Sequence, residues 1–141
     1  MSLLSIRNEI IEVLNTVVKI KAIYYESPTI VNITPSVAVL LAPGVDEPDT
    51  TCDNTMNSSY ILRLMVEKTD DNDNGKAQTD RLLVIVDEVL DKMRLKTNTI
   101  LDNQAYSMMP DWGGVSIGDA GNLNVYYVDV TLSIKTLKSI L

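Results

Sequence analysis

Apolar residues recur at three- and four-residue steps in two segments of the chain, and this spacing is typical of a helix with one buried face. The first segment covers roughly residues 3–19 and carries polar side chains on its opposite face. The second covers about residues 77–95. The pattern predicts two amphipathic helices, and the buried face of the second would consist of Leu82, Ile85, Val86, Val89, Leu90 and Met93.

Shorter segments that are rich in β-branched residues, or that alternate apolar and polar positions, predict β-strands. Ser36–Ala42 is apolar on both faces, as in a strand at the middle of a covered sheet. Ser59–Lys68 carries apolar residues at every second position, with a mixed opposite face. The alternation in Leu123–Thr136 predicts a strand with one buried and one half-exposed face. Ile20–Tyr25 is predicted to be a strand or an extended arm, and Ala105–Met109 a short strand.

These elements follow one another in the order helix, strands, helix, strands. Because regular βαβ alternation is absent, we expect a mainly antiparallel sheet. The acidic segment Val45–Asn57 is predicted to be an exposed loop, and Pro110–Asn122 a glycine-rich connection. Neither an internal repeat nor a linker divides the chain. The expected architecture is a single α+β domain over residues 1–141, with a mainly antiparallel mixed β-sheet packed by two amphipathic helices.

The charge of the chain limits the classes of partner that we expect it to bind. Its 141 residues carry a formal net charge of −7, and residues 43–80 hold nine acidic residues against three basic ones. Because phosphate groups are held by Lys and Arg, we expect neither nucleic acid nor anionic lipid as a primary partner. Cys52 is the only cysteine, and no apolar run approaches the ~18–20 residues that span a bilayer. Glu9 and Glu12 interrupt the N-terminal apolar pattern, unlike a signal peptide, so we expect a soluble protein made inside the cell.

The stretch from Asp70 to Arg81, DDNDNGKAQTDR, resembles the first half of a calcium-binding loop. Asp70, Asn72 and Asn74 occupy the first, third and fifth positions of such a loop, and glycine follows at the sixth. The twelfth position must supply a bidentate carboxylate, but Arg81 stands there. A strand also precedes the loop where the motif needs a helix. The stretch is therefore predicted to link a strand to the second helix, with Asp or Asn side chains capping the helix start.

Catalytic chemistry finds little support in the residue types. The chain has no histidine, which removes Ser-His-Asp and Cys-His catalysis and the usual zinc sites. Gly113 and Gly118 have the gap of a phosphate-binding loop, but Asp119 stands where that motif requires Lys. A predicted strand, not a helix, follows them, so no helix N-terminus is available to an anion. We expect no enzymatic activity, no cofactor and no bound metal.

Trp112 is the only tryptophan, and it is predicted to lie in a turn after Pro110 and before two glycines. Two roles are open for it: a core plug at the edge of the sheet, or an anchor at a protein interface, where Trp is enriched. The same alternatives hold for four tyrosines, with the core role favoured: Tyr24, Tyr25, Tyr126 and Tyr127.

The order and character of the segments also match a known family. The N-terminal helix is followed by a short arm (IKAIYYES), a proline-preceded apolar strand (PSVAVLLA) and an acidic stretch that ends in DNTMNSSYILRLMVEK. An acidic loop, a helix ending in LDKMR and a long terminal strand (VYYVDVTLSI) complete the order. Over nearly its whole length the chain resembles the bacteriophage tail terminators, also called tail completion or minor tail proteins. It departs from them after the second helix, where LKTNTI replaces a frequent Leu-Gly-Gly turn.

This resemblance implies a structural virion protein that forms a hexameric ring on the head-proximal end of the tail tube. Such a ring stops polymerisation of the tube protein and offers a surface to the head connector or neck protein. DNA passes through the lumen and is not bound specifically. In such a ring Asp70, Asp71 and Asp73 would face the channel or a partner. Facing the channel, they would repel DNA and favour its passage.

Two other functions remain open at this point. The first is a related head–tail connector, such as a neck or head-completion protein, which is of similar size to a tail terminator and also forms a ring. A small-molecule or calcium-binding module is the alternative from a different class. For subunit contacts in a ring, pairing through an exposed sheet edge is plausible for the long strand Leu123–Thr136.

Overall fold

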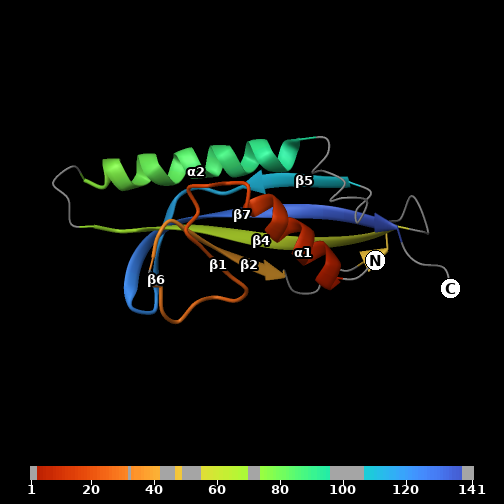
Figure 1. The fold of residues 1–141 in the computed structure, drawn as a ribbon, viewed down its shortest axis with the longest axis horizontal. Coiled ribbons are helices and arrows are strands. Elements are labelled where there is room, and N and C mark those ends of the chain that lie inside the picture. Colours follow the sequence, from red (N-terminus) through yellow and green to blue (C-terminus); the bar gives the residue numbers. More distant parts are fainter. Residues whose placement is uncertain are drawn as a thin grey trace.

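The computed structural model describes residues 3–31, 33–41, 47–48, 55–69, 74–95 and 107–137. Within these ranges the chain forms two helices and seven strands, which build one mixed, mainly antiparallel sheet (Figure 1). This architecture confirms the predicted α+β class. The elements are α1 (Leu3–Leu14), β1 (Ala22–Tyr24), β2 (Ser36–Leu41), β3 (Glu47–Pro48), β4 (Thr55–Glu67), α2 (Lys76–Arg94), β5 (Ser107–Trp112), β6 (Ser116–Ala120) and β7 (Leu123–Leu137).

The described strands of the sheet follow the order β1-β2-β4-β7-β5, with β3 paired to β4 and β6 paired to β7. The pair β1–β2 is parallel, and the other described pairs are antiparallel. The centre is the long pair β4–β7, in which thirteen residues of each strand are in register. One edge of the described sheet is therefore β1, and the other consists of β5 and β6.

Both helices pack on one face of this sheet (Figure 1). All six residues predicted for the inner face of the second helix are buried in α2. They meet alternate residues of the central strands, as the period of a strand requires. The strand residues of this core are Val37, Val39, Tyr60, Leu62, Leu64, Val66, Met108, Val128, Val130, Leu132 and Ile134.

A smaller apolar cluster lies on the opposite face and includes Val31, Ala38 and Met65. The loop between β1 and β2 reaches over this face and is held by the turn between β6 and β7. The Val31 N–H donates to Asn122 Oδ1 at 2.8 Å, and Asn122 Nδ2 donates to the Val31 carbonyl at 3.2 Å. Along β7, Val128, Val130 and Leu132 are buried beneath the helices, whereas the alternate residues from Tyr127 to Ser133 are partly or fully exposed, so the predicted buried and half-exposed faces are confirmed.

The first helix is shorter than predicted, because α1 ends at Leu14 and not near residue 19. The Thr16 hydroxyl donates to the Val13 carbonyl at 2.6 Å, and the next N–H groups bond three residues back, which tightens the chain into turns. Val17 is nevertheless buried. The apolar period therefore continues past the end of the helical hydrogen bonding.

Two connections and the position of one strand also differ from the prediction. The segment Val45–Asn57 contains β3 and the first residues of β4, which pair with each other through Glu47 and Asn57. The glycine-rich segment Pro110–Asn122 contains the end of β5 and all of β6. The long strand β7 lies between β4 and the β5 and β6 strands, so its expected availability for edge pairing is wrong.

Candidate interaction surfaces

The described start of α2 has a left-handed backbone conformation. Asn74 and Gly75 have positive φ values of 59° and 85°, and Gly75 is the N-cap residue without a side-chain cap hydrogen bond. The first turn carries no acidic residue. Asp70, Asp71, Asn72 and Asp73 lie outside the described residues, so the predicted capping by Asp or Asn stays a prediction. The left-handed backbone turns the chain into the helix, and Gly75 adopts this conformation without steric strain.

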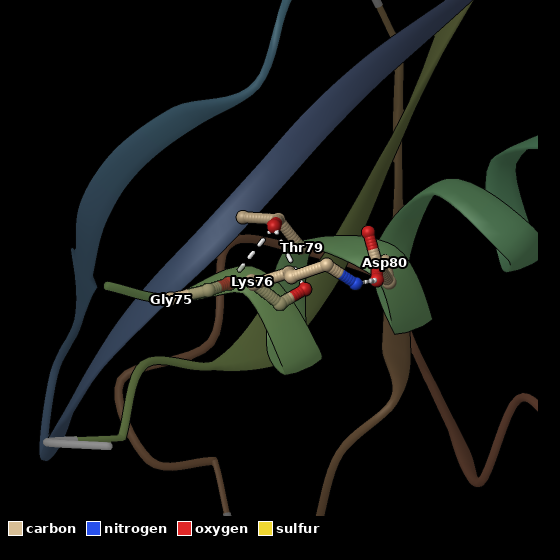
Figure 2. A network of polar contacts seen from close by, with 4 residues as sticks. All are labelled: Gly75, Lys76, Thr79 and Asp80. Atoms are coloured by element: carbon tan, nitrogen blue, oxygen red, sulfur yellow. Dashed lines mark hydrogen bonds and ion pairs between the residues drawn. The ribbon is translucent and has the colours of Figure 1, made fainter. Parts of the chain in front are cut away.

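The first turn of α2 carries its own polar contacts (Figure 2). The Thr79 hydroxyl lies 2.8 Å from the Gly75 carbonyl and 3.1 Å from the Lys76 carbonyl, and it donates to these oxygens. Lys76 Nζ pairs with Asp80 Oδ2 at 2.7 Å, one helical turn further on. Asp80 is therefore paired with Lys76 within the helix. The neighbouring Arg81 is exposed.

The acidic residues Asp70, Asp71 and Asp73 lie outside the described residues, so their proposed channel- or partner-facing role stays a prediction. Among the residues that the structure describes, no group of three or more His, Cys, Asp or Glu side chains is placed to hold a metal ion. Cys52 also lies outside the described ranges.

Trp112 is the last residue of β5, an edge strand, and not part of a turn. Its side chain is 48% exposed, so it does not plug the core. Every residue from Asp111 to Ile117 is exposed, and Ile117 reaches 63%. We call the exposed border formed by residues 111–119 the β5–β6 edge. It presents the apolar side chains of Trp112, Val115 and Ile117 together with the carboxylates of Asp111 and Asp119.

An open groove lies beside the first half of α2 and next to the start of β1. Its volume is about 380 Å³. Two kinds of side chain line this basic groove: the cationic Lys19, Lys21 and Arg81, and the apolar Pro35, Val84 and Ile85.

No local motif in the sequence indicates the basic groove, because two of its cationic residues, Lys21 and Arg81, are sixty residues apart along the chain. One signal for it is present in the sequence: residues 13–25 contain no acidic residue, although the chain is strongly acidic. The backbone helps to shape the groove, since the Lys21 N–H donates to the Pro35 carbonyl at 2.7 Å and joins two of the lining residues.

Arg63 and Asp129 pair on the face of the sheet opposite the helices. They are register partners in β4 and β7, with Nε–Oδ1 and Nη2–Oδ2 distances of 2.9 Å and 3.2 Å. The guanidinium carbon also lies 4.6 Å from the ring centroid of Tyr127. The hydrogen bond to Asp129 raises the pKa of Arg63 above its ordinary value. Because each charge is satisfied by its neighbour, this pair acts as a cross-strand brace.

Neither the comparison with family models nor the comparison with curated proteins finds a match to this chain. Among the described residues, no helix is both long enough and apolar enough to cross a membrane.

Proposed function

We propose that this protein is a structural virion protein, a phage tail terminator that forms a ring, hexameric in the family it resembles, at the head-proximal end of the tail tube. The ring would stop polymerisation of the tube protein and offer a surface to the head connector or neck protein. The observation that carries the proposal is the order of elements, helix, strands, helix, strands, which the chain shares with that family. The α+β fold supports it, because the two helices and the long central strands lie where that order predicts.

The surfaces of the fold are compatible with a ring subunit. A subunit of a cyclic ring needs two different contact surfaces, one for each neighbour. The described sheet has β1 at one edge and the β5–β6 edge at the other, and exposed apolar side chains lie near both: Val84 of α2 in the basic groove, and Trp112 and Ile117 on the β5–β6 edge. Two such surfaces on one chain are what a subunit needs to contact a neighbour on each side, which supports an assembly role.

The net charge of −7 fits the passage of DNA through the ring without binding. A channel lined by carboxylates repels the phosphate backbone, so DNA is not retained. We propose this role for Asp70, Asp71 and Asp73 of the acidic stretch before α2. If a structure of the assembled ring placed these residues on its outer rim, the channel role would be abandoned.

The deciding experiment is electron microscopy of tails assembled with and without the protein. A terminator sets the end of the tube, so its loss is expected to give tails of uncontrolled length, and supply of the protein from a plasmid should restore one length. A neck or head-completion protein would instead give tails of normal length that lack heads. Normal, head-bearing tails in its absence would overturn both assignments.

A calcium-binding module is tested separately by thermal unfolding. A ligand that binds the folded state alone must raise the melting temperature. The terminator proposal predicts no shift on addition of millimolar calcium, whereas a calcium-binding module predicts a clear rise.

A further inference from the structure

We propose that copies of this chain associate head to tail, with the β5–β6 edge of one copy seated in the basic groove of the next. This contact deepens the proposed ring function, on which it rests, by assigning the two surfaces that join neighbouring subunits. The two surfaces belong to opposite borders of the described sheet: β5 and β6 form one border, while the groove adjoins the start of β1 at the other.

The charges of the two surfaces are complementary. The segment 97–134, which contains the β5–β6 edge, has no Lys or Arg, and Asp111 and Asp119 of that edge are exposed. The basic groove brings together Lys19, Lys21 and Arg81, all three of them exposed. None of the three forms a salt bridge with another described residue. An acidic edge facing these cations would draw the copies together and set their register.

The apolar parts of the two surfaces also match. In register, Trp112 lies opposite Val130 and Ile117 lies opposite Tyr126, so both side chains belong to the face of the sheet that the helices cover. They remain exposed because they lie at its border. The basic groove is lined on the same side by α2, and its volume of about 380 Å³ is within the range that admits a tryptophan side chain. Trp112 is the natural anchor for it, because buried Trp side chains dominate contact energies.

Two different surfaces in contact make a heterologous interface. Each added copy leaves a free edge at one end and a free groove at the other, so association continues until a ring closes or a filament extends. A contact between two identical surfaces would instead stop at two copies. The proposal therefore predicts assemblies of three copies or more, formed without any second protein.

Two variants of the full chain test the two surfaces separately. The groove variant carries Lys21→Glu and Arg81→Glu, and the edge variant carries Asp111→Asn and Trp112→Ala. All four positions are exposed, so circular dichroism and melting temperature should match the wild-type chain. Each variant alone is expected to lose self-association by about tenfold or more in sedimentation velocity.

Matched controls change the same charges elsewhere on α2. The controls are Asp91→Asn and Arg94→Glu, at exposed positions ten and thirteen residues beyond Arg81, which is roughly 15–20 Å along a helix. Both controls should assemble as the wild type does. Raising the ionic strength from about 0.1 M to about 1 M shortens the Debye length from about 10 Å to about 3 Å and should weaken wild-type assembly.

Mixing the two variants gives the sharpest test. The groove variant keeps an intact edge and the edge variant keeps an intact groove, so one productive contact remains between them. The mixture is expected to form a one-to-one heterodimer that grows no further. A mixture that stays monomeric, or that forms larger assemblies, would contradict the proposed pairing.

Failure of this contact can be told apart from failure of the terminator function. If the wild type forms rings that both variants also form, the subunit contact lies elsewhere, while the tail-length experiment still stands as the test of function. A wild-type chain that stays monomeric at every concentration, or that stops at a dimer, overturns the head-to-tail contact. If tail length is unaffected by loss of the protein while head-to-tail rings form, the contact holds and the function is wrong.

Discussion

Gly75 lies against the side-chain hydroxyl of Tyr126, and this contact joins the start of α2 to the start of β7. A Cβ atom at Gly75 would collide with Tyr126 Oη, and the φ angle of Gly75 is +85°. Glycine alone meets both conditions, since it has no Cβ and adopts positive φ freely. The glycine of the acidic stretch DDNDNG is therefore a packing residue at the start of the helix.

Replacement Gly75→Ala is expected to lower the free energy of unfolding by about 1–3 kcal/mol, through backbone strain at positive φ and the clash with Tyr126. Urea denaturation followed by circular dichroism measures this change. In a Tyr126→Phe background the clashing oxygen is absent, so the same replacement should cost less.

Gly113→Ala is the matched control, because a Cβ there would meet nothing within 4 Å. We expect a change of about 0.5 kcal/mol or less. Equal losses of stability at Gly75 and Gly113 would show that the contact with Tyr126 does not restrict the first position.

The buried faces of α2, β4 and β7 were predictable because side chains repeat every 3.6 residues in a helix and every second residue in a strand. The six residues predicted for α2, from Leu82 to Met93, are all buried. In contrast, β3 and β6 were missed, since Glu47, Pro48 and the glycine-containing β6 follow neither period. They are strands because β4 and β7 extend beyond their other partners and offer unpaired backbone groups.

The candidate surfaces likewise combine features that the local sequence predicts with features that depend on the whole fold. Trp112 was identified from residue type alone, yet its exposure depends on β5 being an edge strand, which is a property of the whole sheet. The interior position of β7 could not be predicted, because strand order is not encoded in the pattern of a single strand. The basic groove brings Lys21 and Arg81 together from distant parts of the chain, and it forms only where the fold places α2 across from the segment before β1.

Replacement Asn122→Ala should release the loop between β1 and β2 from the sheet. The side chain of Asn122 accepts from the N–H of buried Val31 and donates to its carbonyl, so both groups would lose this partner. We expect a loss of about 1–3 kcal/mol and faster hydrogen exchange of the Val31 amide. Asn124→Ala is the control, since Asn124 contributes its backbone carbonyl to Lys68 and that bond is retained. Unchanged exchange at Val31 would exclude the anchoring role of Asn122.

The Arg63–Asp129 pair should contribute more to stability than the Lys76–Asp80 pair. The side chains of the first pair are 35% and 34% exposed, against 77% and 57% for the second. Solvent screens both, so we expect a coupling energy of about 0.5–1 kcal/mol for the first and about 0–0.5 kcal/mol for the second. Double-mutant cycles with Arg63→Met and Asp129→Asn, and with Lys76→Met and Asp80→Asn, measure the two energies. A larger coupling in the exposed helical pair would contradict this ranking.

The stability of the fold should fall in alkaline solution through Tyr60. Burial in the core raises the pKa of Tyr60 above 10.0, and nearby Arg7 lowers the pKa by a smaller amount. Below about pH 10 the phenol is protonated in both states, so its contribution is fully present. Above that pH the unfolded chain loses the proton first, and the contribution is lost as pH rises through the folded pKa.

Urea unfolding from about pH 8 to about pH 11 should therefore show a steeper decline in the free energy of unfolding for the wild type than for Tyr60→Phe. Tyr25→Phe, which removes an exposed hydroxyl, is the matched control. A decline that Tyr60→Phe leaves as steep as in the wild type would show that another group controls alkaline unfolding.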